Sequence, residues 1–239
     1  MKILALDSSG IVASVAVVED DTLLAEYTVN YKKTHSRTLL PMLDEIVKMT
    51  ELDLESVDAI AVAAGPGSFT GLRIGSATAK GLGLALKKPL VAVPTVDALA
   101  YNLYDAQGLV CPVMDARRKQ VYTGIYKFED HQLVTVKEQW AAPMEELIEE
   151  LNERGETVIF LGDGVPVFRE MIQEKLKVPY SFAPAHLNKQ RAAAVAALGM
   201  IYYKEGRTET AEEHTPEYLR LSQAERERAE REKAQKTEK

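Results

Sequence analysis

Residues 63–75 read Ala-Ala-Gly-Pro-Gly-Ser-Phe-Thr-Gly-Leu-Arg-Ile-Gly, and this is the most informative stretch of the sequence. The apolar run at residues 59–64 breaks on a Gly-Pro-Gly turn, which opens a helix of small residues. The pattern predicts a strand, a tight loop and a helix N-terminus, whose unpaired N–H groups can hold an anion. The loop is neither a Walker A motif nor a G-x-G-x-x-G motif. Spacing alone favours a plain turn.

The helix that follows, at residues 70–86, has a small residue at every fourth position. These residues share one face of the helix, and they are Gly71, Gly75, Ala79 and Gly83. A glycine inside a helix costs about 0.5–1 kcal/mol relative to alanine, so the close approach of another backbone must offset it. The sequence favours two partners equally: the chain's own sheet, and a helix of another chain.

The composition is that of an ordinary globular protein. The chain has 239 residues, 46% hydrophobic and 27% charged, enough for one large or two small domains. The single cysteine, Cys111, excludes an intramolecular disulfide and a cysteine metal cluster. Neither a signal peptide nor a membrane span is predicted, so we expect a cytoplasmic protein. The net charge of −7 gives no electrostatic signature of nucleic-acid binding for the chain alone.

Apolar runs and turn residues predict the elements of the first half. Strands are expected at residues 3–6, 11–18, 22–29, 59–64 and 89–93, and helices at residues 34–49, 70–86 and 95–104. Pro41 predicts an early boundary or a kink in the first of these helices. Thr95 is expected to cap the last one.

The second half repeats this order. Strands are expected at residues 109–114, 121–128, 132–139 and 157–161, and helices at residues 143–154, 166–177 and 188–203. Three strands, a helix, a strand and a helix thus occur twice. Asp7 and Asp115 stand at equivalent points, as do two Gly-x-Gly loops, which indicates an internal duplication. A last ordered segment is expected at residues 214–220, and residues 222–239 form a charged tail, helical or disordered.

Two domains of this order resemble the actin-like ATPase (ASKHA) superfamily, whose fold is ribonuclease H-like. Five motifs are similar to the bacterial TsaB family, also called YeaZ: KILALDSS at 2–9, THSRTLLP at 34–41, AGPGSFTGLRIG at 64–75, MDAR at 114–117 and PEYLR at 216–220. The resemblance implies an α/β fold with two βββαβα-type domains, residues 1–104 and 105–221. The helix at residues 188–203 is expected to pack back toward the first domain.

The resemblance also implies a function. TsaB proteins act in threonylcarbamoylation of adenosine at tRNA position 37 (t6A), in tRNAs that read codons starting with adenine. They are noncatalytic partners of the paralogous transferase TsaD. We therefore expect a heterodimer with TsaD, recruitment of the ATPase TsaE, contact with tRNA only through the complex, a homodimer when the chain is alone, and no membrane association.

The same resemblance points to a partner surface on the helices at residues 34–49 and 70–86. The expected partner-binding residues are His35, Leu39, Leu43, Ile46, Gly71, Arg73, Gly75, Ala79 and Gly83. On this interpretation Gly75→Leu leaves the monomer folded and prevents formation of the complex.

The metal site of TsaD-like enzymes is not expected here. Those enzymes carry two metal-binding histidines after a segment equivalent to residues 89–93, whereas this chain has Thr95 and Leu99 at those positions. Leucine offers a metal no donor atom. The four histidines are scattered along the chain and are interpreted as surface or capping residues.

A nucleotide or anion site is the remaining candidate. Asp7, Ser8 and Ser9 match the turn that contacts metal and phosphate in actin-like ATPases, and the set is completed by Gly65, Gly67 and Arg117. Turn capping by Asp7 and Ser8 is the leading interpretation. No cofactor is expected on the chain alone; ATP or ADP and a divalent metal are expected only within the TsaB–TsaD–TsaE assembly. The alternative functions are an autonomous actin-like ATPase or phosphotransferase and a metalloprotease-like glycoprotease.

Overall fold

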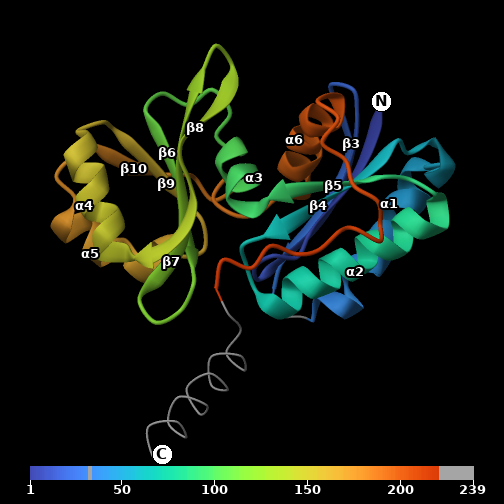
Figure 1. The fold of residues 1–239 in the computed structure, drawn as a ribbon, viewed down its shortest axis with the longest axis horizontal. Coiled ribbons are helices and arrows are strands. Elements are labelled where there is room, and N and C mark those ends of the chain that lie inside the picture. Colours follow the sequence, from blue (N-terminus) through green and yellow to red (C-terminus); the bar gives the residue numbers. More distant parts are fainter. Residues whose placement is uncertain (32–33, 221–239) are drawn as a thin grey trace, which may run out of the picture.

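The protein consists of two halves, each built on a five-stranded sheet, as seen in a computed structural model that describes residues 1–31 and 34–220 (Figure 1). The strand orders are β3-β2-β1-β4-β5 and β10-β9-β6-β7-β8. In each sheet the first three strands in sequence are antiparallel and the later ones are parallel to the first. The predicted α/β class and duplicated actin-like order are confirmed. The charged tail predicted at residues 222–239 lies outside the described residues.

The first sheet is covered by helices on both faces. Its elements are β1 (Lys2–Asp7), β2 (Val12–Glu19), β3 (Thr22–Asn30), η1 (His35–Arg37), α1 (Leu39–Thr50), η2 (Leu54–Ser56), β4 (Ala59–Gly65), α2 (Phe69–Leu86), β5 (Leu90–Pro94) and α3 (Thr95–Tyr101). Helices α1 and α2 cover one face, and α6 covers the other. Because β4 is buried on both sides, its sequence is a continuous apolar run rather than an alternation.

The second half repeats the arrangement. Its elements are β6 (Leu109–Asp115), β7 (Gln120–Glu129), β8 (Gln132–Pro143), α4 (Met144–Arg154), β9 (Val158–Leu161), α5 (Val165–Lys175), β10 (Tyr180–Phe182) and α6 (Ala192–Lys204). Helices α4 and α5 pack on one face, and α3 of the first half packs on the other. Strand β10 is not predicted from the sequence, because three residues are too few to show a period.

The structure revises the predictions for the starts of α1 and α3, and α6 begins at Ala192 rather than at residue 188. The helix predicted at residues 34–49 is divided into η1 and α1, and Pro41 is the third residue of α1. A proline fits the first turn because its missing N–H would have had no partner in the helix. Thr95 does not cap α3: it is the first helical residue, and Pro94 precedes it as N-cap. Within the described residues, the buried Thr95 hydroxyl has no hydrogen-bond partner.

The small-residue face of α2 packs against the chain's own sheet. A Cβ atom on Gly71 would overlap the backbone carbonyl of Ser8, and one on Gly75 would lie 2.6 Å from Ser8 Oγ. Further along, a Cβ on Gly83 would lie 2.9 Å from Leu90 Cδ2, and Ala79 is fully buried. The prediction that this face meets another chain is therefore wrong, and Gly75→Leu would disrupt the monomer itself.

Helices α3 and α6 interlock the two halves. Helix α6 follows the second half in sequence but packs on β1, β2, β4 and β5 of the first. The Asp97 carboxylate on α3 accepts hydrogen bonds from Tyr126 Oη of β7 (2.7 Å) and Tyr202 Oη of α6 (3.1 Å). Burial raises the pKa of Asp97, while both hydroxyl donors oppose that rise. Helix α6 thus packs back on the first half, as expected for the helix at residues 188–203.

The segment at residues 208–220, here called the C-terminal strap, lies along α2 (Figure 1, red). Glu209 forms a β-bridge with Leu90. The His214 side chain is 1% exposed, with Nδ1 2.6 Å from Glu209 Oε1 and Nε2 2.8 Å from Ser76 Oγ. His214 is therefore a buried anchor of the strap, and its prediction as a surface or capping residue is wrong.

The close contact of α2 with β1 predicts opposite effects for two glycines of one helix. Gly71→Ala is expected to destabilise the protein by about 1–3 kcal/mol, because the new methyl group meets backbone that cannot move aside. Gly81→Ala is the matched control: nothing lies within 4 Å of its Cβ position. It is expected to stabilise by about 0.5–1 kcal/mol through helix propensity alone. Urea unfolding measures both, and equal effects would contradict the packing described.

Candidate functional site

A cleft of about 580 Å³ opens between the two halves. It lies where β1 and β6 end and where α2 begins. Its wall in the first half includes Ser9, Gly67 and Ser68. The loop between β4 and α2 is held against the end of β1, because Ser68 N–H donates to Ser9 O at 2.7 Å. A Cβ on Gly67 would overlap that same carbonyl, so only glycine permits the approach.

Asp7 lies behind this wall and does not line the cleft. Its side chain is buried, and Oδ1 accepts from the N–H of Ser9 at 2.9 Å and from the Ser9 hydroxyl at 2.7 Å. Burial raises the pKa of Asp7 to about 6, against the opposing effects of the Ser9 hydrogen bonds and the charge of His35. This carboxylate caps a turn inside the first half.

Ser8 and Gly65 are also engaged away from the cleft. The Ser8 hydroxyl donates to Gly71 O at 2.8 Å and joins β1 to α2. Gly65 lies under the strap, where a Cβ would overlap Glu217 O. Of the six predicted anion-site residues, the structure brings together Ser9, Gly67 and Arg117 at the cleft. The other three support the wall from behind.

The opposite wall ends in a basic turn between β6 and β7. Arg117, Arg118 and Lys119 have φ values of 66°, 55° and 60°, three consecutive non-glycine residues in the left-handed region. Such residues cost about 1 kcal/mol or more each. Arg117 donates from its backbone N–H to Asp115 Oδ1 at 2.8 Å and from Nη1 to Asp115 Oδ2 at 3.1 Å. The turn holds three cations at the mouth of the cleft.

The cleft also contains polar residues that the sequence reasoning missed. Asp163, Lys189 and Arg220 line it. Burial raises the pKa of Asp163, and the charge of Lys189 opposes that rise. Arg220 Nη1 donates to Ala116 O at 2.7 Å, which fastens the strap to the second half. Arg220 ends the PEYLR motif, and Asp163 lies in the second Gly-x-Gly loop at residues 162–164, whereas nothing local distinguishes Lys189.

The residues predicted to bind a partner divide into buried and exposed sets. Besides the small face of α2, Leu39, Leu43 and Ile46 lie in the core beneath α1, so the prediction that they meet another chain is wrong. His35 is half-buried, with Nε2 2.8 Å from Gly10 O. Arg73 is exposed, with its guanidinium 5.8 Å from the Phe69 ring centroid.

The outward surface of helices α1 and α2 carries small and apolar side chains. We name it the α1–α2 outer face, and it comprises Leu40 of α1 with Ala77, Gly81 and Leu84 of α2; Met49, nine residues after Leu40, is exposed on the other side of α1. Leu40 is 55%, Met49 83% and Leu84 56% exposed. An exposed apolar surface of this kind is typical of protein contact sites.

The positions of the TsaD metal ligands do not fit a metal in this chain. Thr95 is fully buried, and Leu99 packs in the apolar core beside Val96 and Val110. Within residues 1–31 and 34–220, no cluster of three or more His, Cys, Asp or Glu side chains is placed to hold a metal ion. In the same ranges, no helix is both long and apolar enough to cross a bilayer. Burial raises the pKa of the Cys111 thiol to about 12, which disfavours a thiolate.

Comparisons with known proteins agree on one family. The family model described as TsaD, tRNA N6-adenosine threonylcarbamoyltransferase, matches residues 22–228. The tRNA threonylcarbamoyladenosine biosynthesis protein TsaB of Bacillus subtilis is 36% identical, over 94% of this chain and 96% of its own length. TsaB of Escherichia coli is 30% identical, over 92% and 95%. A Pseudomonas aeruginosa structure described as similar to peptidase YEAZ covers 92% of this chain and 99% of its own, at 27% identity and a TM-score of 0.77.

The buried Asp7 carboxyl predicts a pH-dependent stability. Its folded pKa of about 6 exceeds the ordinary value near 3.9, so its stabilising contribution is complete below about pH 4 and is lost as the pH rises through 6. Asp7→Asn keeps an acceptor for Ser9 and does not titrate. Between pH 4 and pH 7, the free energy of unfolding of the wild type should fall by roughly 3 kcal/mol relative to Asp7→Asn. Urea unfolding at both pH values tests this, and a constant difference would contradict it.

Proposed function

The chain belongs to the TsaB family, and from this membership we propose that it is a noncatalytic subunit in the biosynthesis of threonylcarbamoyladenosine in tRNA. It acts in the cytoplasm by forming a heterodimer with TsaD, which transfers the threonylcarbamoyl group to adenosine 37, and by recruiting the ATPase TsaE. In the absence of TsaD, the same surface pairs with a second copy of the chain.

The buried side of α3 supports the noncatalytic role. Where the resemblance places metal-binding histidines in TsaD, this chain packs Leu99 into an apolar core. The two aspartates at the ends of β1 and β6 are also committed to their own turns. Asp7 accepts from Ser9, and Asp115 is paired with Arg117. These contacts favour a structural use of the residues that actin-like enzymes use for catalysis.

In this proposal, nucleotide binds only to the assembled complex with TsaD and TsaE. Asp7 is behind the cleft wall, and the Ser9 hydroxyl donates its proton to Asp7. In the chain alone, neither the Asp7 carboxylate nor the Ser9 hydroxyl is therefore directed at a ligand. ATP or ADP and a divalent metal are held only once TsaD and TsaE contribute their residues.

The observation that carries the proposal is the α1–α2 outer face. Gly81 lies inside α2 with nothing within 4 Å of its Cβ position, so no contact within the described chain offsets the low helix propensity of this glycine. Ala77 lies one turn away on the same exposed side. Small residues flanked by exposed Leu40 and Leu84 suit the close approach of a partner helix. The partner surface is thus the row of α2 opposite to the one predicted from the sequence.

Ala77→Arg is expected to leave the monomer folded and to abolish the complex with TsaD, because a long charged side chain would prevent close helix packing. The matched control is Ala185→Arg, an exposed alanine between β10 and α6. Size-exclusion chromatography with light scattering, on each variant mixed with TsaD of the same organism, measures the complex. A one-to-one complex with folded Ala77→Arg would refute the surface, and ATP turnover by the chain alone would refute the noncatalytic role.

A further inference from the structure

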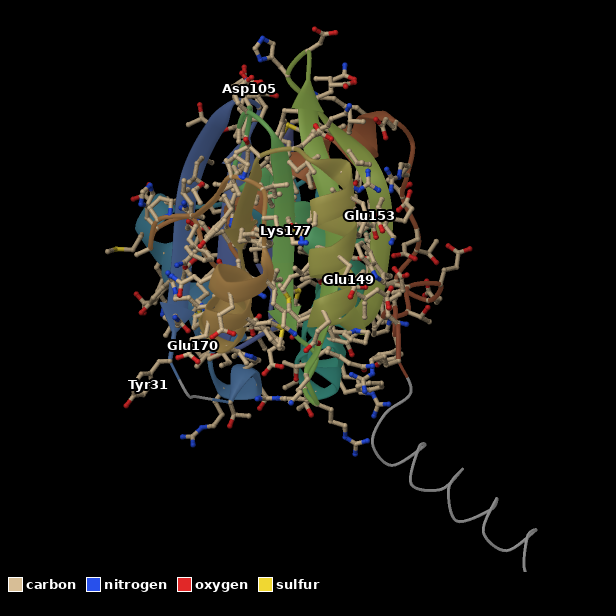
Figure 2. All side chains as sticks on the ribbon, turned by 90° about the vertical axis from the view of Figure 1, so that its left-hand side faces the viewer. Tyr31, Asp105, Glu149, Glu153, Glu170 and Lys177 are labelled. Atoms are coloured by element: carbon tan, nitrogen blue, oxygen red, sulfur yellow. The ribbon has the colours of Figure 1, made fainter. Side chains whose placement is uncertain are left out.

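Charge is unevenly distributed over this acidic protein. The formal net charge is −7, yet the cleft is lined by four basic side chains, Arg117, Arg118, Lys189 and Arg220, against two acidic ones, Asp115 and Asp163. Lys119, which is exposed, adds a fifth cation next to Arg118, whereas Lys189 and Arg220 are half-buried. Acidic residues instead lie along α4, on the outer side of the second half, where Glu146, Glu149, Glu150 and Glu153 are neighbours. Figure 2 labels Glu149 and Glu153 on this side. The fold therefore makes a local cationic surface that the net charge conceals.

The acidic groups of the cleft cancel only part of this surface, because Asp115 neutralises Arg117 and leaves the other cations. Asp163 accepts the backbone N–H of Asp115 at 3.3 Å and is half-buried. Arg118 and Lys119 are exposed on the turn, and the Arg117 side chain is 82% exposed. These cations stand at the mouth, where they can reach a large anionic partner.

An aromatic stack adjoins the cations. Phe69 lines the cleft and stacks on Tyr218 of the strap, with ring centroids 4.3 Å apart and planes 2° apart. The Arg73 guanidinium lies 5.9 Å from the Tyr218 centroid, and its Nε donates to Tyr218 Oη at 3.2 Å. Tyr218 remains 37% exposed. Cations combined with exposed rings are the combination by which proteins hold single-stranded RNA, through phosphates and stacked bases.

Resting on the proposed role in tRNA modification, we propose that this mouth contacts tRNA directly and holds the sugar–phosphate backbone of a single-stranded segment. The cations Arg117, Arg118, Lys119, Lys189 and Arg220 neutralise phosphates, and Tyr218 offers a ring to a base. A free nucleotide is less favoured, because the hydroxyl of Ser9 and the carboxylate of Asp7 bond to each other rather than facing the cleft.

The turn at residues 117–119, whose φ values are positive, allows a test that separates RNA binding from folding. Replacing Arg118 and Lys119 by glycine removes two cations and also relieves two positive φ values. The variant should therefore unfold at the wild-type temperature or above. The matched control is Lys87→Gly, another exposed lysine with positive φ (55°), at the far end of the 18-residue helix α2, about 27 Å from the cleft.

The probe is a fluorescein-labelled, unmodified anticodon stem–loop of a tRNA that reads a codon starting with adenine. Anisotropy titrations over a range of salt concentrations use the full chain, alone and with TsaD. Each lost contact to a single strand should lower the salt slope by about 0.7 and weaken binding about fivefold at 0.1 M salt, so the double variant should bind roughly 25-fold more weakly. Lys87→Gly should bind as the wild type does.

Three results would overturn the inference, and the first two are wild-type binding by the double variant both alone and with TsaD, or no binding by the wild type in either form. If ATP displaces the RNA and the double variant no longer binds ATP, the cleft is a nucleotide site and the inference also fails. Formation of the TsaD complex is measured on the same samples. A complex that persists without an RNA contact refutes only this inference, whereas absence of any complex refutes the proposed function.

Discussion

The close contact between α2 and the end of β1 positions both the wall of the cleft and the α1–α2 outer face. Ser8 occupies the space that side chains at Gly71 and Gly75 would need, and its hydroxyl bonds to Gly71 O. This approach fixes where α2 begins, and therefore where the loop with Gly67 meets the end of β1. It also directs the opposite row of α2 to the surface. One backbone contact thus sets both the wall of the cleft and the orientation of the outer face.

The two halves depend on each other because α6 and the C-terminal strap, which follow the second half in sequence, pack on the first half. After β10, helix α6 crosses to the first sheet, and the C-terminal strap follows α2 back to the cleft, where Arg220 bonds to Ala116 O. Helix α3 makes the reverse crossing, and Asp97 joins it to both halves through Tyr126 and Tyr202. Each half is completed by a segment distant in sequence. Movement of one half against the other would therefore strain these shared elements before it opened the cleft.

Local pattern predicts the elements of this fold, and the duplicated order predicts its class. It does not predict which row of α2 is buried, because Gly71 and Gly75 recur with the same four-residue spacing as Ala77 and Gly81. That choice follows from the shape of Ser8 and β1, which lie more than sixty residues away in sequence. The same limit applies to the cleft, since Asp163, Lys189 and Arg220 meet only after both crossings are made. His214 reads as a polar surface residue until Ser76 and Glu209 are placed beside it.

Helix α2 separates two surfaces of different chemistry. Its outer face presents Ala77, Gly81 and Leu84, without a charged group among them, whereas its first turn lies at a mouth rich in arginine and lysine. Burial of apolar area is largely insensitive to salt, while phosphate contacts weaken steeply with it. A protein partner on the first surface and RNA on the second would therefore respond differently to ionic strength. The two surfaces lie on the outer side of α2 and at its first turn, so the contact proposed for each uses different residues of the helix.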